Sequence, residues 1–373
     1  MTKVGRRTEG PDLESRLSAH RTFWNRNNNH PVASFRVGDF FFSRHFEAAR
    51  NLLVPHKLIT ADLLNPKDYT KDYERMFQDS VSCGQEGFWT AEPFTGIPWM
   101  EAVLGCEVRG GEESFTAKGG FNACADAAES AETTLRGLRT NPLSNPWLKK
   151  YLEFTEALVK LSGGRFPVGQ PITRGPTDMV GALLGQSEMI YALSDDPDTM
   201  GRLISAVTAI FLRVIELQKA LIPPFHGGSS LGFYHVWAPG TSIWYQDDLS
   251  AILSPTMYRH FFIDAGTRIC DGFDYAAIHL HPSSFFILDD LLSIPRLRAI
   301  EVNKDVGGPT IGEMMETLRK IQEKKCLILW GDLTLEDLAL VKRDLHPQGL
   351  FFHIVAPTLE EAKKRGEYIH AWE

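Results

Sequence analysis

The sequence predicts an α/β protein, and more specifically a (β/α)8 barrel with an N-terminal arm and an insertion over one barrel end. Three observations lead to this fold class. The chain has 373 residues, which is long enough for eight β/α units. Apolar runs of strand length alternate with helical patterns through its second half, as they do in parallel βαβ units. Eight such apolar runs are found in all, the number of strands that closes this barrel.

The expected strands are short apolar runs bounded by turn-forming residues. They cover residues 32–37, 57–60, 165–169, 231–237, 275–281, 298–303, 326–330 and 350–355. The expected helices cover residues 178–193, 197–221, 255–270, 285–292, 311–324, 335–345 and 359–371. Asp196 and Pro197 are a start signal for the long helix, and Pro223 with Pro224 stops it.

The pattern predicts one arm and one large domain. Residues 1–30 are polar, with a single helical pattern over 12–24, and are typical of an arm or an oligomer contact. Residues 31–373 contain neither a low-complexity linker nor a repeat of fixed period, so they are expected to form one domain. The segment 84–145, rich in glycine and acidic residues, is expected to lie over one end of the barrel.

Charge and cysteine content exclude several classes of protein. The 39 basic and 47 acidic residues give a formal charge of −8, without the basic patch that nucleic-acid binding requires. The apolar stretches are shorter than the ~18 residues that span a bilayer, and no secretory signal begins the chain. Five cysteines without paired spacing are typical of reduced thiols and disfavour a thiolate zinc site. We therefore expect a cytoplasmic protein that binds neither nucleic acid nor membranes.

Histidines occur at the ends of expected strands, and they suggest a metal site. His279 and His281 are two residues apart, so in a strand both side chains lie on one face and can reach one ion. His353, on the last expected strand, is the candidate third ligand. Three neutral imidazoles with one open position are a ligand set for catalytic zinc. The alternative is that these histidines form hydrogen bonds in a polar pocket without a metal.

Carboxylates near the same strand ends are candidate catalytic groups. Asp247 and Asp248 form a pair that can bind substrate, transfer protons or orient metal-bound histidines. Asp248 has the alternative role of capping the helical segment that follows it. Asp332 follows the expected strand 326–330 and is assigned to catalysis with this pair.

Further polar and aromatic residues are expected to bind the substrate. Arg36 and Arg174 can each bind an anionic group, although Arg174 could equally be a surface arginine in a loop rich in proline and glycine. The other expected substrate-binding residues lie on or at the ends of predicted strands: His235, Trp237, Glu301 and Asn303. The sequence contains no GxGxxG, P-loop or HExxH motif, which argues against the common dinucleotide, nucleotide and metalloprotease functions.

Several short motifs follow one another in a recognisable order. They are Gly96-Ile97-Pro98, Leu104-Gly105-Cys106, Asp196-Pro197, Asp247-Asp248 followed by Ser254-Pro255 and Tyr258, His279-Leu280-His281, Trp330-Gly331-Asp332, and Ala356-Pro357-Thr358-Leu359-Glu360-Glu361-Ala362. In this order the chain resembles the uroporphyrinogen decarboxylase superfamily, roughly over residues 31–373. The resemblance implies a (β/α)8 barrel and a homodimer. The superfamily also contains zinc-dependent methyltransferases that work with corrinoid proteins.

Two departures from the family patterns bear on function. The true decarboxylases carry an arginine motif for the porphyrinogen carboxylates, and the corresponding residues 34–39 retain only Arg36. The methyltransferase branch has a His-x-Cys pair and a later cysteine as zinc ligands, and the matching positions here are His279, His281 and His353. Imidazoles in place of thiolates leave a zinc ion more Lewis acidic, which favours a bound hydroxide or a polarised carbonyl.

These observations favour a metal-dependent enzyme of methyl or other group transfer, with zinc as the metal and a small molecule as substrate. A corrinoid would have to be carried by a separate partner protein, because this chain has no corrinoid domain of its own. The first alternative is a metal-free decarboxylase of the uroporphyrinogen decarboxylase type. A metal hydrolase with three histidine ligands and a binding protein without turnover are further alternatives, and the fold alone does not choose among them.

Overall fold

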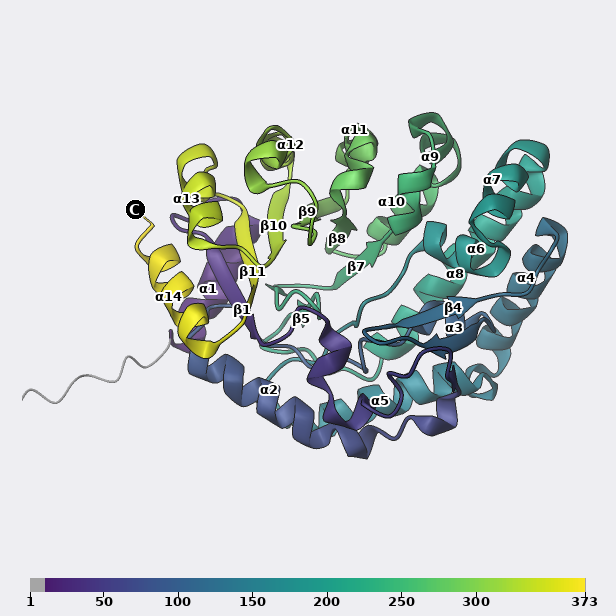
Figure 1. Ribbon diagram of the computed structural model, residues 1–373, viewed down its shortest axis with the longest axis horizontal. Coiled ribbons are helices and arrows are strands. Elements are labelled where there is room, and N and C mark those ends of the chain that lie inside the picture. Colours follow the sequence, from purple (N-terminus) through teal and green to yellow (C-terminus); the bar gives the residue numbers. More distant parts are fainter. Residues whose placement is uncertain (1–10, 373) are drawn as a thin grey trace, which may run out of the picture.

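The computed structural model describes residues 11–372 and is built around a six-stranded parallel sheet (Figure 1). The strands lie in the order β1-β11-β10-β9-β8-β7, and every neighbouring pair is parallel. Their bounds are β1 (Val32–Val37), β7 (Ser242–Gln246), β8 (Tyr275–Leu280), β9 (Leu297–Asn303), β10 (Cys326–Gly331) and β11 (Leu350–Ala356). Helices and the core bury both faces of this sheet, as expected for parallel strands made of continuous apolar runs.

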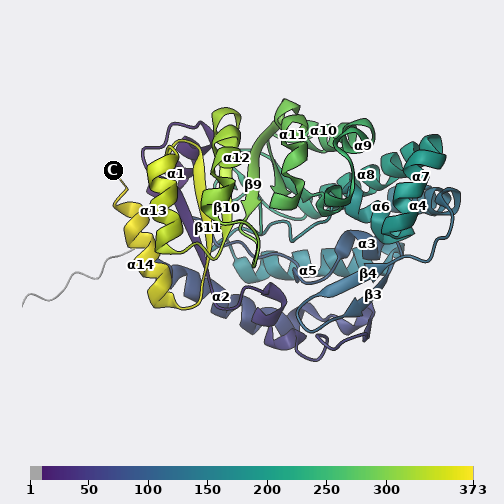
Figure 2. The same ribbon diagram turned by 45° about the horizontal axis from the view of Figure 1, so that its top comes forward.

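The helices lie along the outside of the strands (Figures 1 and 2). They are α1 (Leu13–Trp24), α2 (Thr70–Cys83), α3 (Trp99–Val103), α4 (Cys124–Thr140), α5 (Pro146–Ser162), α6 (Pro176–Leu184), α7 (Gln186–Asp195), α8 (Pro197–Lys219), α9 (Pro255–Phe261), α10 (Ile263–Asp271), α11 (Leu288–Ser293), α12 (Ile311–Lys324), α13 (Leu335–Asp344) and α14 (Leu359–His370). Short strands form two small antiparallel sheets, β2 (Leu58–Ile59) with β3 (Glu107–Gly110) and β4 (Phe115–Lys118), and β5 (Ser229–Ser230) with β6 (Trp237–Ala238).

Local signals account for several helix ends. Asp196 caps α8 by accepting a hydrogen bond from the N–H of Thr199, and Pro197 occupies the first helical position. Thr310 and Glu313 form a reciprocal capping box at the start of α12. The expected helix 178–193 is divided into α6 and α7 at Gly185, whose φ of +92° interrupts the helix. The expected helix 255–270 is likewise divided, at Phe262.

Five of the eight expected strands are confirmed, namely those that became β1, β8, β9, β10 and β11. The run 57–60 was expected to be a strand of the barrel, and this is wrong. It forms β2, which pairs antiparallel with β3 outside the central sheet. The expected strand 231–237 is mostly a tight turn, with Gly232 and His235 at φ of +77° and +59°. The strand that joins the sheet here is β7, which is not among the expected strands. Both segments are apolar and buried, so hydrophobic pattern alone could not distinguish them.

Two extended segments lie between the sheet edges β1 and β7. The N–H of Gly87 donates to the carbonyl of Ala33 in β1 at 2.9 Å. Ala91 forms a parallel bridge with Val168, and Arg174 forms one with Gln246 of β7. Residues 165–169 were expected to be a strand, and they contribute only the single bridge at Val168.

The helix predicted in the N-terminal arm is confirmed and packs against the amino ends of the sheet strands. Its Asp12 cap accepts from the N–H of Ser15. The indole N–H of Trp24 donates to the carbonyl of Trp237 at 2.8 Å, and its ring lies 4.9 Å from that of Tyr275 at the start of β8. Residues 1–10 of the arm lie outside the described part of the chain. In that described part, no helix is both long enough and apolar enough to cross a membrane.

The segment 84–145 contributes α3, α4 and the β3–β4 hairpin. The hairpin lies at the far end of the molecule from α13 and α14 in both ribbon views (Figures 1 and 2). Residues 95–98 and 113–115 line a cavity together with Trp330 at the carboxyl end of β10. Part of this segment therefore reaches the strand ends, while α4 packs along α8.

Gly87 tests how closely the segment after α2 approaches β1. A Cβ atom at this position would lie 2.3 Å from the Cβ of Ser34, so Gly87→Ala should lower the free energy of unfolding by about 1–3 kcal/mol or more. Gly137 in α4 has nothing within 4 Å of such a Cβ atom, so Gly137→Ala should raise stability by about 0.5–1 kcal/mol. Urea denaturation of both variants measures the difference. Equal stability of Gly87→Ala and the wild type would contradict this packing.

Candidate metal centre

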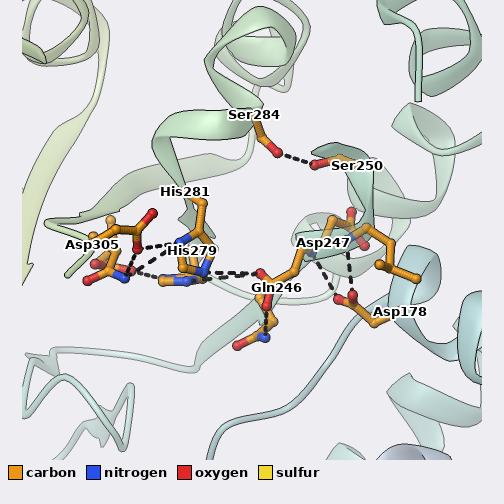
Figure 3. A network of polar contacts seen from close by, with 12 residues as sticks. Asp178, Gln246, Asp247, Ser250, His279, His281, Ser284 and Asp305 are labelled. Carbon is orange, nitrogen blue, oxygen red and sulfur yellow. Dashed lines mark hydrogen bonds and ion pairs between the residues drawn. The ribbon is translucent and has the colours of Figure 1, made fainter. Parts of the chain in front are cut away.

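Histidine and acidic side chains gather at the carboxyl ends of β7, β8 and β9 (Figure 3). The strand register places Gln246 beside His279, and His279 beside Glu301. Since side chains in register on parallel strands share one face of the sheet, these three form a row. His281 directly follows β8, and Asp248 begins a short 3₁₀ helix that follows β7.

Each of the two imidazoles is held by a carboxylate through its Nδ1 atom. His279 Nδ1 bonds to Glu301 Oε2, and His281 Nδ1 bonds to Asp305 Oδ1 at 2.7 Å. Because an ionised carboxylate only accepts hydrogen bonds, Nδ1 carries the proton in the neutral imidazole and Nε2 keeps its lone pair. This assignment leaves both Nε2 atoms available as metal ligands.

The Nε2 atoms face one oxygen of Asp248. Asp248 Oδ1 lies 4.0 Å from Nε2 of His279 and 3.9 Å from Nε2 of His281. One donor atom from each of these residues lies within 4.8 Å of the other two. Zinc bonds of about 2.0–2.2 Å put tetrahedral ligands about 3.3–3.5 Å apart, so small side-chain rotations bring this set to zinc geometry. The donors therefore fit a divalent metal ion with an open coordination position.

Negative charge surrounds His279. Glu301 is fully buried, and its Oε2 also accepts from the hydroxyl of Tyr234 at 2.8 Å, while Oε1 has no partner in the described part of the chain. Burial by itself would lower the pKa of His279, but Glu301, Asp248 and Asp305 outweigh it and raise this pKa to about 9. The site therefore favours a positive charge at this position, which either a proton or a metal ion can supply.

Asp248 is held in place from two sides. The amide of Gln246 donates to Asp248 Oδ2 at 2.6 Å, which leaves Oδ1 directed at the histidines. The carboxylate of Asp178, at the start of α6, accepts from the N–H groups of Asp248 and Leu249 at 3.0 and 3.1 Å. Burial and the neighbouring Asp248 and Asp247 charges raise the pKa of Asp178.

Asp247, which sequence analysis paired with Asp248, is directed into the protein. Its Oδ1 accepts from the N–H and the hydroxyl of Thr177, and its Oδ2 accepts from the hydroxyl of Tyr258 at 3.0 Å. Burial raises the pKa of Asp247 to about 7, against the effect of these three donors. Asp247 thus joins α6, β7 and α9, whereas Asp248 faces the histidines.

His353 lies apart from this cluster. Its Nδ1 is 2.6 Å from the hydroxyl of Ser34, and its Nε2 accepts from Nε of Arg36 at 3.2 Å. Burial and the charge of Arg36 lower the pKa of His353, so it is neutral. Both ring nitrogens are engaged within β1 and β11, and the structure does not bring them to Asp248, His279 and His281.

Arg36 is part of the same interior network. It is nearly buried and binds the carboxylate of Glu92 at 3.2 Å and the carbonyl of Phe233 at 2.9 Å. Burial raises the pKa of Glu92 to about 7, although Arg36 acts in the opposite direction. His235 lies beside His353, with ring centroids 4.6 Å apart, and both of its own ring nitrogens are buried without a partner among the residues that the structure describes.

A cavity of about 210 Å³ reaches the carboxyl end of β10, although Asp248, His279 and His281 do not line it. Arg174, one of the predicted substrate-binding residues, lines it, and the Arg174 backbone bridges to Gln246 beside Asp248. Trp330 also lines this cavity and lies in register with Asn303, whose amide binds Asp305. Arg174 donates from Nη1 to the buried Glu101 at 3.0 Å, so its other donors remain for a ligand.

Two predicted site residues lie elsewhere. The Asp332 side chain is 59% exposed and pairs with Arg365 of α14 at 2.8 Å. It therefore contacts α14 and not the histidine cluster. The ring of Trp237 is buried with Leu17 and Phe88 under α1, and its indole N–H donates to the carbonyl of Phe225. Trp237 therefore lies with the arm at the amino ends of the strands, and not at the cluster.

Sequence reasoning did not single out several residues that support the cluster. They are Asp305, Asp178, Gln246 and Tyr234. The one available signal was the position of Asp305 two residues after Asn303, in the loop that leaves an expected strand end. Gln246 and Tyr234 have no local signal, because their roles depend on strands that are distant in sequence.

No protein-family model matches this sequence, and no curated protein matches it either. Among solved structures, the chain is similar to a methyltransferase from Methanosarcina mazei, with a TM-score of 0.65. The similarity covers 96% of this chain and 98% of that chain, at 14% sequence identity. At this identity the comparison shows a shared fold alone, because one fold can support many activities.

Proposed function

We propose that this chain is a zinc-dependent methyl- or group-transfer enzyme whose metal is bound by Nε2 of His279, Nε2 of His281 and Oδ1 of Asp248. The observation that carries the proposal is that both Nε2 atoms face one Asp248 oxygen while carboxylates hold both Nδ1 atoms. Carboxylates hold metal-ligating histidines in this way in many zinc sites. Asp248 thus takes the position first assigned to His353.

The charge of this donor set suits methyl transfer better than three neutral histidines would. Two imidazoles and one carboxylate carry one negative charge, whereas the three histidines expected from sequence carry none. A more negative ligand set leaves a zinc-bound substrate sulfur more nucleophilic, as the thiolates of the methyltransferase branch do. The fold shared with the Methanosarcina mazei methyltransferase supports the same choice.

We infer that the central sheet closes as a (β/α)8 barrel. The segments around residues 87–91 and 167–174 would occupy the two positions between β1 and β7, supported by the Ala91–Val168 and Arg174–Gln246 bridges. In this fold the active site lies at the carboxyl ends of the strands, which is where the histidine cluster and the Arg174 cavity lie.

A zinc ion in this site would act as a Lewis acid toward a substrate sulfur or oxygen atom. Glu301 and Asp305 keep the two imidazoles in the tautomer that binds a metal, and Gln246 keeps Asp248 turned toward them. Arg174 would bind an anionic group of the substrate in the adjacent cavity. The methyl donor would be a corrinoid held by a separate partner protein, and the enzyme would act as a homodimer.

Metal analysis tests the ligand set directly. In untagged protein, His281→Ala and Asp248→Ala should each lose one equivalent of zinc relative to the wild type, because each removes a proposed ligand. His353→Ala and Asp332→Ala should lose none, since neither residue faces the cluster. Elemental analysis after dialysis measures the content. If His353→Ala loses zinc and Asp248→Ala does not, the proposed set is overturned.

Glu301→Gln tests the role of the carboxylate behind His279. The variant keeps an acceptor for Nδ1 but removes the charge, so zinc affinity should fall about 10- to 100-fold with the stoichiometry unchanged. Competition with a chelating dye measures the affinity. Asp332→Asn is the control, because it makes the same carboxylate-to-amide change away from the cluster. Asp332 is exposed and pairs with Arg365 in α14, whereas Glu301 is fully buried. Unchanged affinity in Glu301→Gln would argue against metal binding by His279.

Transfer activity is tested with methylcobalamin as donor and small thiols that carry a carboxylate as acceptors. The methyl group should pass to the sulfur while the cobalt keeps both electrons of the broken bond, so the methylcobalamin spectrum should be lost. Asp248→Ala should abolish this reaction, and Arg174→Met should mainly raise KM for the acceptor. Conversion of a porphyrinogen by metal-free protein, without methyl transfer, would instead establish a decarboxylase.

A further inference from the structure

A second group of metal-ligating side chains lies away from the proposed active site. His30 lies just before β1, Glu86 follows α2, and His370 is the last residue of α14. One donor atom from each lies within 4.8 Å of the others, and His30 Nε2 is 2.8 Å from Glu86 Oε1. The three residues are thus brought together by the tertiary fold and not by local sequence.

The buried carboxylate of Glu86 is an independent indication that a cation binds here. Glu86 is only 6% exposed, and its Oε2 atom is inaccessible and has no hydrogen-bond partner among residues 11–372. A buried carboxylate oxygen without a donor is costly, so such atoms are rare unless a cation or an ordered water is bound. The guanidinium of Arg16 donates to the backbone carbonyls of Glu86 and Gly87, at 3.1 and 2.6 Å, and not to this carboxylate.

This group lies at the opposite end of the sheet from the histidine cluster. His30 precedes the first residue of β1, and Gly87, which follows Glu86, bonds to Ala33 near the start of that strand. The His279 cluster lies at the carboxyl ends of the strands. The two sites therefore share no residue and can be studied separately.

We propose that His30, Glu86 and His370 bind a second divalent transition-metal ion, with zinc as the best match. Two imidazoles and one carboxylate are zinc ligands, and the exposed position of His370 leaves the fourth position to water. This ion joins the end of α14 to the segment that enters β1 and to the segment after α2. The ion thereby crosslinks the last turn of α14 to two segments at the amino ends of the sheet strands.

The test uses zinc titration of untagged, metal-stripped protein that carries Asp248→Ala, which removes the proposed active-site ligand. This variant should still bind one equivalent of zinc. Zinc should also raise its Tm, because binding adds RT ln(1 + [Zn]/Kd) to the free energy of unfolding. Adding His370→Ala or Glu86→Gln should abolish both effects. Adding His260→Ala, an exposed histidine in α9, should leave both unchanged.

Cobalt provides a second readout that does not depend on stability. Cobalt(II) bound by Asp248→Ala protein should show the visible bands of a four- or five-coordinate site, and His370→Ala should remove them. His370 is exposed at a helix end, so its replacement should leave the fold intact. If zinc binding and the cobalt bands persist in Asp248→Ala/His370→Ala protein, this second site is overturned. The active-site proposal would stand, since it depends on other residues.

Discussion

The register between β8 and β9 is the constraint on which the candidate active site depends. It places the fully buried Glu301 beside His279, so that its carboxylate takes Nδ1 and leaves Nε2 for a ligand. A shift of one residue would turn Glu301 to the other face of the sheet. The buried charge would then have no partner, and His279 would lose the contact that orients it. The rest of the site is formed by Asp248, which faces both imidazoles, by Asp305, which binds His281, and by Gln246, which orients Asp248.

Histidines in the same sheet have opposite electrostatic surroundings. His279 lies among carboxylates that raise its pKa, whereas burial and Arg36 lower the pKa of His353. A site for a cation can form only in the first environment, because Arg36 would repel a metal ion from the second. Arg36 and Glu92 instead form an interior ion pair, and the guanidinium of Arg36 lies over the rings of Phe42 and Phe233. The difference between the two histidines therefore follows from their neighbours and not from their residue type.

Much of the second half of the fold could be predicted from sequence because its signals are local. The strands β8 to β11 are apolar runs between helices with clear caps, such as Thr310 with Glu313 and Asp196 with Pro197. β7 could not be separated from the apolar residues 231–237, which the structure uses for a tight turn with His235 at positive φ. The choice between them depends on which segment pairs with β8, and such pairing is a long-range interaction.

The sequence by itself determined the alternation of strands and helices and the pairing of His279 with His281 on one side of a strand. It also placed Asp248, Glu301 and Asn303 among the candidates. Only the tertiary structure decided that Asp248 faces the two histidines and that His353 instead binds Ser34 and Arg36. The reason is physical: periodicity within one segment determines which way a side chain points, but the distance between side chains on different strands depends on register and loop paths. The grouping of His30, Glu86 and His370 has the same origin, since three segments distant in sequence meet there.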